Sequence, residues 1–364
     1  MIPRVIKNCK LAFYFSLWVL YLRYPRGVSI ADKQNIEASP DADFNLLTNK
    51  RIHFWVPHNT AGAQFILWEV IPKLIDLLAE RGANVDITIS ESLSDHPYDL
   101  IFSFKEPCPD HIQALRKVLV ICDEIDRLWS HLDQFDSIIC TSSYELAELI
   151  TSKAKEVHFV PEIEPIALLE AGERRVIGGW NKSADSIFWH GGRYTLQELV
   201  DLIPFFARLR DVVGFGSLEI VCGDGVVPAE LAGYPWIEVT SWSRDNLVKI
   251  SEKCRLAILP ARKSLKNSYL KPASRVRCSY ALALPAVGDS RVPEVVRLSS
   301  ALGMPVIDFS DEGLAIQSIA ELWRDSSKLK EAAKDGHLHV KNNHSIDAVL
   351  SVWILTLSML LRRV

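Results

Sequence analysis

The stretch SIFWHGGRYTLQEL, residues 186–199, decides the fold because it joins a strand signal to a helix signal through two glycines. The apolar run at its start is typical of a buried strand, and Thr195 with Glu198 forms a capping box that begins a helix. In doubly wound α/β sheets, ligands bind beyond the carboxyl ends of the strands, where helix amino ends present free N–H groups. Gly191 and Gly192 let backbone approach a ligand, and Arg193 suits phosphate oxygens. The stretch therefore indicates a phosphate-binding turn, with a plain turn as the alternative.

Short apolar strands alternate with amphipathic helices on both sides of this stretch. Candidate strands of the first half lie at 52–56, 85–89, 99–102, 117–121, 137–140 and 157–160. Those of the second half lie at 186–189, 218–222, 236–240, 256–259, 285–287 and 305–308. Near-continuous apolar strands that alternate with helices favour parallel sheets covered on both faces. The predicted fold is α/β, with two doubly wound Rossmann-like domains that face a cleft.

The predicted boundaries follow from where this alternation breaks. Two prolines and an irregular polar stretch separate a domain at 50–165 from a second domain at 184–345. A basic apolar segment, expected to be helical, occupies 1–30, and a C-terminal packing helix occupies 346–364. A helix is also expected between the first two strands, with a kink or a break at Pro72.

Composition excludes several classes of protein. The 364 residues are 48% hydrophobic and 24% charged, which does not fit a collagen-like or disordered chain. Residues 1–26 carry five Lys or Arg and no acid, and the last helix is also basic, which leaves residues 27–345 with a net charge of −10. Such a body argues against a nucleic-acid partner. The seven cysteines form no CxxC pair, so we expect buried thiols in a reducing compartment.

The two ends of the chain suggest contact with a membrane. The apolar run at 11–22 is shorter than the ~20 residues of a spanning helix, while its aromatic and basic flanks suit an anionic membrane surface. A monotopic anchor is therefore predicted; a helix that docks on the body and a signal peptide cleaved near residue 30 are the alternatives. Residues 348–361 are also too short to span, which favours a packing helix or a second interfacial contact. We expect a cytoplasmic protein, peripheral on the inner face of a membrane.

A second candidate for anion binding lies at 261–277, which carries six cations and no acid. The cations repel one another unless they are solvated or offset by an anion, and a nucleoside diphosphate is an anion of suitable size. Arg275 lies in the first turn of a helix expected at 274–283, where the helix dipole disfavours a cation unless an anion is near. A solvated loop and a patch for lipid headgroups are the alternatives.

These motifs, in this order, resemble the nucleotide-binding domain of GT-B glycosyltransferases, closest to family 4-like members. The residues that carry the resemblance are IFWHGGR (187–193), IVCGDG (220–225), WIEVTSW (236–242), LAILP (256–260), KPASR (271–275), ALALPAV (281–287) and VPEVV (292–296). TSSYELA (141–147) and FVPEI (159–163) resemble the end of the acceptor domain. The resemblance covers roughly residues 50–345.

The resemblance implies transfer of a sugar from a nucleotide-sugar donor, with UDP or GDP as carrier, to a glycan, lipid or small-molecule acceptor. It implies that Arg193 and Lys271 hold the diphosphate with help from Arg275, and that Glu294 meets the ribose or the base. His190, Gly191, Gly192 and Gly223 complete the expected donor site. Cations and helix amino ends would then neutralise the leaving group, so no metal or other cofactor is expected.

Candidate residues on the acceptor side follow two strands of the first half. His58 is positioned to take the proton of an acceptor hydroxyl, although a structural histidine is the alternative. Gly62 is expected to bring backbone N–H groups near phosphate. Asp123 and Glu124 are candidates for acceptor binding or for the base, unless they only begin a helix.

One departure from the resemblance leaves two functions open. Many members carry two glutamates separated by seven residues, and here these places hold Leu270 and Cys278. Either the enzyme holds its donor differently, or the chain is a catalytically inactive GT-B-like binding protein. A nicotinamide-dependent dehydrogenase is disfavoured because no GxGxxG follows an early strand.

Overall fold

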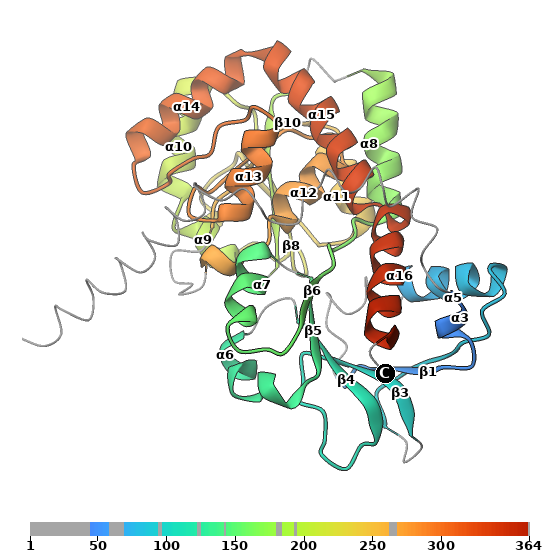
Figure 1. The fold of residues 1–364 in the computed structure, drawn as a ribbon. Helices are drawn as coiled ribbons and strands as arrows, with labels where there is room; N and C mark the ends of the chain where they lie inside the picture. The colour runs from blue at the N-terminus through green and yellow to red at the C-terminus, as the bar shows by residue number, and fades with distance from the viewer. Residues whose placement is uncertain are drawn as a thin grey trace, which may run out of the picture. The chain divides into compact units, whose positions relative to one another are not determined.

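Two parallel β-sheets organise the chain in the computed structural model (Figure 1). The first sheet has the order β2-β1-β3-β4-β5-β6: β1 Arg51–Trp55, β2 Asp86–Ser90, β3 Tyr98–Phe104, β4 Ala114–Ile121, β5 Ser137–Cys140 and β6 Val157–Phe159. The second has the order β11-β10-β7-β8-β9: β7 Ser186–Gly191, β8 Leu218–Cys222, β9 Ile237–Thr240, β10 Cys254–Leu259 and β11 Ala286–Gly288. The predicted pair of parallel sheets is therefore confirmed.

The structure describes residues 44–57, 69–93, 97–121, 125–141, 143–179, 184–192, 195–261 and 268–362. They belong to one unit, Phe44–Val364. The predicted segment 1–30, with its membrane anchor, lies outside the described residues.

Helices follow most of the strands, as the alternation predicts, but none of the described residues between β2 and β3 or between β3 and β4 is helical. The helices of the first half are α3 Phe44–Leu47, α5 Ile71–Glu80, α6 Ile125–Leu128 and α7 Tyr144–Thr151, with a 3-10 helix η3 at Trp129–Gln134. Those of the second half are α8 Ile166–Gly178, α9 Leu196–Val200, α10 Ile203–Val213, α11 Arg244–Ser251, α12 Ser274–Ala281, α13 Pro293–Ala301, α14 Glu312–Arg324, α15 Ser326–His344 and α16 Ile346–Arg362. Short 3-10 helices η5 and η6 lie at Ala229–Leu231 and Ser268–Leu270.

Local chemistry explains several helix starts. The N-cap side chain accepts a hydrogen bond from the backbone N–H three residues later at Ser143 before α7, Ser243 before α11, Asp311 before α14 and Asp325 before α15. Pro72 occupies the first turn of α5, where its missing N–H has no intrahelical partner to lose. Residues 69 and 70, directly before α5, are π-helical, so the regular α-helix is interrupted next to Pro72, where the sequence predicts a kink or a break.

One predicted strand is wrong. Residues 305–308 form only a single bridge, between Ile307 and Asp289. Pro305 lacks the N–H that a ladder needs at that position, and the Asp308 carboxylate accepts hydrogen bonds from the Ser310 N–H and hydroxyl. The segment therefore turns toward α14 instead of extending the second sheet.

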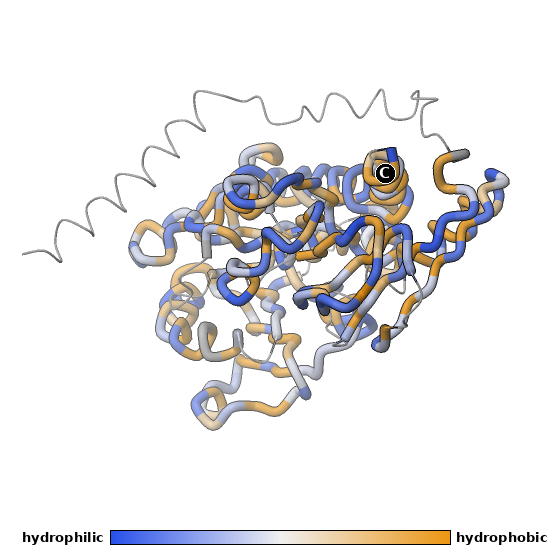
Figure 2. Tube along the Cα trace, turned by 60° about the horizontal axis from the view of Figure 1, so that its bottom comes forward, coloured by the Kyte–Doolittle hydropathy of each residue, from blue (hydrophilic) through white to orange (hydrophobic). Residues whose placement is uncertain are grey.

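The last helix returns to the first sheet. Trp353 of α16 packs edge-on against Phe54 and Phe102, with ring centroids 6.4 and 6.1 Å away. Arg116 of β4 donates to the Leu360 carbonyl at 2.7 Å. Most residues of α16 are apolar, and the tube next to the C-terminus is largely orange in Figure 2. Among the described residues, one helical stretch, 326–362, is long and apolar enough to span a bilayer, yet half of its most apolar window is buried. The predicted packing helix is confirmed.

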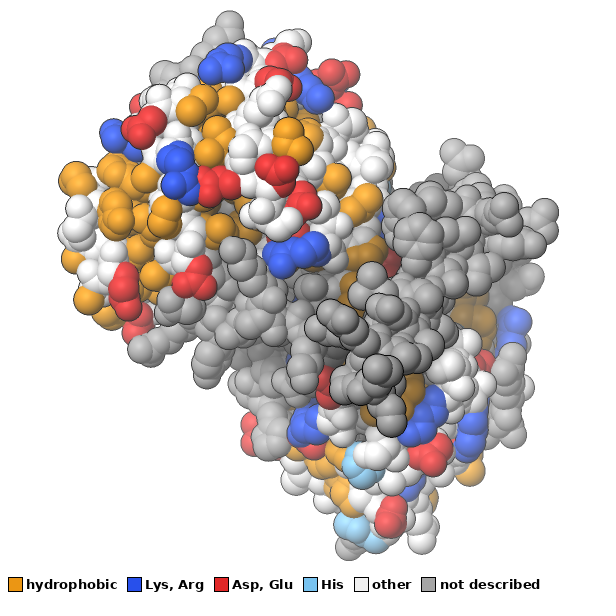
Figure 3. Space-filling view, turned by 90° about the vertical axis from the view of Figure 1, so that its left-hand side faces the viewer, with side chains coloured by type: hydrophobic (Ala, Val, Ile, Leu, Met, Phe, Trp, Pro, Cys, Tyr) orange, Lys and Arg blue, Asp and Glu red, His pale blue; other side chains and the backbone are white. Residues whose placement is uncertain are grey.

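Charges of both signs are interspersed over the surface. On the face in Figure 3, described acidic and basic side chains alternate over the C-terminal elements, and no continuous basic stripe is visible among them. The cysteines that the structure describes, Cys108, Cys140, Cys222, Cys254 and Cys278, are buried free thiols. These positions match the expectation of small buried side chains.

Candidate functional site

A cavity of about 600 Å³ opens where β7 and β8 end and α12 begins. Its walls are Glu162, Ile163, Glu164, Pro165, Leu168, His190, Gly191, Gly192, Gly223, Trp242, Arg244, Leu247, Ser274, Arg275, Arg277 and Cys278. The segment 162–165 connects the first sheet to α8, so the connection between the two halves forms one wall. The carboxyl edge of the second sheet forms the opposite wall, at the place where doubly wound sheets bind ligands.

The glycine turn after β7 has the form that the sequence predicts. A Cβ at Gly191 would lie 2.4 Å from Thr195 Oγ1 and 2.9 Å from Trp189 Cη2, so only glycine fits there. A Cβ at Gly192 would meet no atom within 4 Å. The Thr195 hydroxyl donates to the Gly192 carbonyl at 2.7 Å and fixes the turn. Packing requires the first glycine, and the second leaves the backbone open to the cavity.

His190 links β7 to α12. Its Nε2–H donates to the Arg275 carbonyl at 3.1 Å, and the ring is buried. Burial and the nearby Arg275 charge lower the pKa of His190 to about 4. His190 is therefore a neutral structural donor near neutral pH, and it ties the glycine turn to the first turn of α12.

The amino end of α12 faces the cavity through Ser274 and Arg275. Arg275 lies over the Trp189 ring, 5.8 Å from its centroid, and donates to the Pro260 carbonyl at 2.6 Å. Its N-cap residue, Ala273, has no side chain that could cap the helix, and the first turn holds no acid, while the Glu294 carboxylate accepts the Ala273 N–H at 2.8 Å. Backbone N–H groups and a fixed guanidinium thus make this end of the cavity suitable for an anion.

A cluster of acids that sequence reasoning missed surrounds Arg277. Its Nη2 donates to Glu162 at 2.6 Å and its Nε to Glu164 at 3.2 Å, while Nη1 lies 3.9 Å from Glu294. Burial alone lowers the pKa of Arg277, but the three carboxylates outweigh burial and raise it. Burial raises the pKa of Glu164 and of Glu294 to about 7 in spite of the Arg277 charge. The expectation that an anionic ligand offsets this cation is wrong for Arg277, because glutamates of the chain do so.

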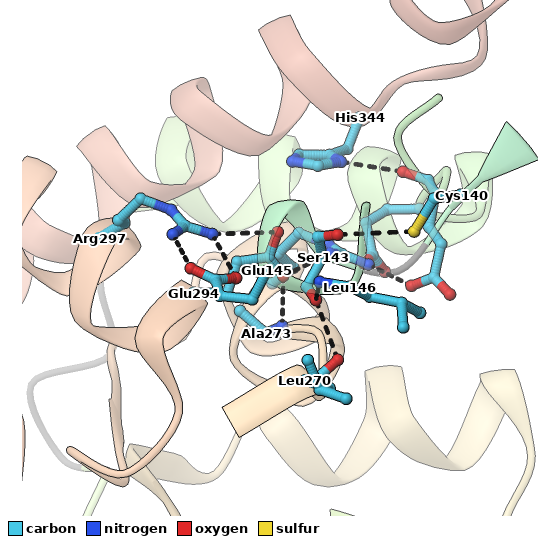
Figure 4. A network of polar contacts seen from close by, with 12 residues as sticks. Cys140, Ser143, Glu145, Leu146, Leu270, Ala273, Glu294, Arg297 and His344 are labelled. Atoms are coloured by element: carbon cyan, nitrogen blue, oxygen red, sulfur yellow. Dashed lines mark hydrogen bonds and ion pairs between the residues drawn. The ribbon is translucent and has the colours of Figure 1, made fainter. Parts of the chain in front are cut away.

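A network of polar contacts joins α7 to the segment before α12 (Figure 4). Ser143 donates to the Leu270 carbonyl at 2.9 Å, and the Leu270 side chain is buried in the apolar cluster of the first sheet. Arg297 of α13 binds both carboxylate oxygens of Glu145. The position where a glutamate was expected by resemblance therefore holds an apolar contact between the two halves.

Glu294 is placed differently from its predicted role. Its carboxylate accepts the Ala273 N–H at 2.8 Å and lies 3.8 Å from Arg297. It is not among the residues that line the cavity, so in this structure it holds the start of α12 and makes no wall for the predicted ribose or base.

The remaining predicted site residues divide into three groups. His190, Gly191, Gly192, Gly223 and Arg275 line the cavity together. Lys271, which precedes α12, is half-buried and does not line it. His58, Gly62, Asp123, Glu124 and Arg193 lie outside the described residues. The sequence signal for the acids that were missed is the segment 160–165, where Glu162 and Glu164 lie between two prolines.

The fold can be compared with known proteins. No family model and no curated protein matches the sequence. HepE from Anabaena, solved with UDP and glucose, matches 85% of this chain and 100% of its own at 10% identity and a TM-score of 0.57. A glycosyltransferase from Rickettsia africae matches 87% of this chain and 100% of its own at 12% identity, also with a TM-score of 0.57.

The chain has a GT-B fold. TarM of S. aureus, solved with Fondaparinux, alpha-GlcNAc-glycerol and UDP, matches 71% of this chain at 11% identity and a TM-score of 0.52. The match spans 55% of TarM itself. Identities this low establish the shared GT-B architecture and leave donor, acceptor and chemistry to be argued from the cavity.

Proposed function

We propose that this GT-B protein is a glycosyltransferase that moves a sugar from a nucleoside-diphosphate donor to an acceptor. The observation that carries the proposal is the cavity itself: the glycine turn after β7 and the start of α12, with Arg275, converge on one space. Backbone N–H groups and a guanidinium are the groups that bind a diphosphate.

The chemistry proposed is stabilisation of the leaving group. As the bond between the sugar and the diphosphate breaks, negative charge grows on the leaving oxygen, and fixed N–H groups and Arg275 stabilise that charge. Arg193 and Lys271 are proposed to add positive charge. We propose that this transfer proceeds without a metal ion, because the chain's own cations supply the neutralising charge.

The donor nucleotide is proposed to lie with its base away from α12. Leu168, Leu247 and the partly exposed Trp242 line the rest of the cavity, and such apolar and aromatic walls suit a base. HepE and TarM were each solved with UDP, so UDP is the first carrier to test and GDP the second.

The residues proposed to bind and activate the acceptor come from the sequence analysis. His58, Asp123 and Glu124 are the proposed candidates for the base that takes the acceptor proton, with Gly62 near the phosphates. A glycan or lipid acceptor at a membrane surface is part of the proposal, because the run at 11–22 and its basic flanks suit anionic lipid. Flotation of the full chain with anionic and neutral vesicles tests it, and absence of binding to both excludes the membrane role.

Calorimetry with UDP and GDP tests the donor site. We expect Arg193→Ala and Arg275→Ala each to weaken diphosphate binding about tenfold or more, since each removes a charge-assisted hydrogen bond. Lys341→Ala is the matched control, because Lys341 pairs with Glu173 on the surface and does not line the cavity. Equal affinity of all three variants and the wild type contradicts the proposed site.

A second candidate function is a catalytically inactive nucleotide-binding protein. Leu270 packs into the first sheet's apolar cluster and Cys278 lines the cavity at the two places expected to hold glutamates. Release of UDP or GDP from sugar donors, measured with and without glycan or lipid acceptors, separates the two functions. Tight nucleotide binding without release or transfer supports the inactive protein.

A further inference from the structure

The cavity has two chemically different ends. At the start of α12 it offers hydrogen-bond donors: backbone N–H groups and Arg275. At the segment between the two halves it offers acceptors: the carboxylates of Glu162 and Glu164, on either side of Ile163. A diphosphate is attracted to the first end and repelled by the second, so the second end must take another part of the ligand.

The acidic end holds more carboxylates than cations. Glu162, Glu164 and Glu294 all lie within 4 Å of the single Arg277 guanidinium. Arg277 is fully engaged by them, and its side chain is 4% exposed. Carboxylates only accept hydrogen bonds, and each has room for about four. This end therefore favours a ligand that donates hydrogen bonds and carries no negative charge.

Glu164 is the carboxylate whose position is best fixed for accepting a hydrogen bond from a ligand. Its backbone N–H donates to the His344 carbonyl at 2.8 Å, and Pro165 follows it directly. Its side chain is 7% exposed and lines the cavity, with one oxygen on Arg277. Both the backbone and the carboxylate are held before any ligand arrives, which lowers the entropy lost on binding.

The surroundings of Glu164 suit a nucleoside. Leu168 and Leu247 line the same cavity and offer apolar surface to a base. Cys278, also on the wall, has its pKa raised well above the usual value by burial and by the Glu164 charge, so the thiol stays neutral. Between a base and a diphosphate lies the ribose, whose hydroxyls donate hydrogen bonds to carboxylates in other doubly wound domains.

We infer that Glu164 accepts a hydrogen bond from a ribose hydroxyl of the donor nucleotide, with Arg277 as the residue that positions its carboxylate. The inference rests on the proposed nucleotide-sugar function and adds to it a specificity for ribose over deoxyribose. Burial raises the pKa of Glu164 to about 7 without ligand, and a donated hydroxyl hydrogen bond stabilises the ionised form.

The test compares each nucleoside diphosphate with its 2′-deoxy and 3′-deoxy analogues. UDP and GDP are titrated into the wild type, and the tighter of the two is used with its analogues on Glu164→Gln and Glu164→Ala. Arg277 keeps its pairs with Glu162 and Glu294 in both variants, so neither leaves the guanidinium unpaired. Thermal unfolding with and without ligand checks that each variant is folded.

We expect loss of one ribose hydroxyl to weaken binding to the wild type about tenfold or more, since the acceptor is charged. The preference for ribose is expected to be smaller in Glu164→Gln, whose neutral amide still accepts, and absent in Glu164→Ala. Glu173→Gln is the matched control, because Glu173 pairs with Lys341 on the surface and does not line the cavity, and it is expected to keep the wild-type preference.

Three outcomes overturn the inference, and they are distinguishable. If the wild type binds the nucleotide and both deoxy analogues with equal affinity, the protein recognises no ribose hydroxyl. If Glu164→Ala keeps the full wild-type preference for ribose, another residue recognises the hydroxyl. If the alanine variant is unfolded, Glu164→Gln is judged in the same way. If the wild type binds neither UDP nor GDP, the proposed function fails together with the inference.

Discussion

The two ends of the cavity are built in different ways. The end with hydrogen-bond donors, called here the glycine-turn end, comes from two short local motifs, the glycine turn after β7 and the first turn of α12, joined by the His190 hydrogen bond. The acidic end is built around Arg277 by residues more than 100 positions earlier, Glu162 and Glu164, together with Glu294. Local sequence therefore encodes the glycine-turn end, whereas the acidic end exists only after the chain folds.

The largest expected effect comes from removing the cation at the centre of the acidic end. Arg277→Ala leaves three carboxylates around an unfilled space, with no cation to offset their burial. We expect the free energy of unfolding at pH 8 to fall by about 3–5 kcal/mol. Urea unfolding measures it, with Arg297→Ala as a control, because Arg297 is more exposed and lies at the edge of the same cluster. Equal losses for both variants would show that Arg277 has no special role.

The next largest effect is a pH dependence of the free energy of unfolding, which comes from the acidic end. Because the folded pKa of Glu164, about 7, lies above the ordinary value of 4.5, this group's stabilisation is fully present below pH 4.5 and is lost as the pH rises through 7. We expect the stability advantage of the wild type over Glu164→Gln to shrink by about 2–3 kcal/mol between pH 5 and pH 8.

Urea unfolding at several pH values measures this difference. His190, whose pKa is lowered to about 4, destabilises the fold as the pH falls below 6.5, but it does so in both proteins and its effect cancels in the comparison. Parallel stability profiles for the wild type and Glu164→Gln would contradict the prediction.

A smaller effect is expected from a substitution in the glycine-turn end. Gly191→Ala places a methyl group against Thr195 Oγ1 and the Trp189 ring, so we expect a loss of about 1–2 kcal/mol in the free energy of unfolding. Gly192→Ala is the matched control, because its methyl group meets open space, and a change within about 0.5 kcal/mol is expected. Thermal and urea unfolding of the pair measure the difference; a larger loss at Gly192 would contradict the structure of the turn.

The smallest effect concerns the contact between α7 and α13. Glu145→Gln weakens its pair with Arg297, but Arg297 stays near Glu294 and is partly solvated. We expect a loss below about 1 kcal/mol in the free energy of unfolding and an unchanged preference for ribose in the nucleotide titrations. A loss of that preference would show that this contact sets the geometry of the acidic end.

Sequence reasoning predicted the strand, turn and helix start of the glycine-turn end because each of these parts is local. The strand at 186–189, the glycines after it and Arg275 in a helix start are recognisable from spacing alone, and the carboxyl edge of a parallel sheet brings them together. It did not predict the acidic end, since the prolines around Glu162 and Glu164 indicated only a boundary. Arg277 was counted among the six cations of 261–277 that were expected to meet an anionic ligand, although its side chain is buried and faces three carboxylates.

The sequence by itself determined the alternation of strands and helices, and with it the two parallel sheets and the place of the glycine turn. These features depend on periodicity and on glycine, which act over a few residues. The tertiary structure decided which charges meet: it placed Leu270 in the first sheet's core, Glu294 at the start of α12, and Glu164 beside Arg277. Ion pairing and burial depend on distances between residues far apart in the chain, and only packing fixes those distances.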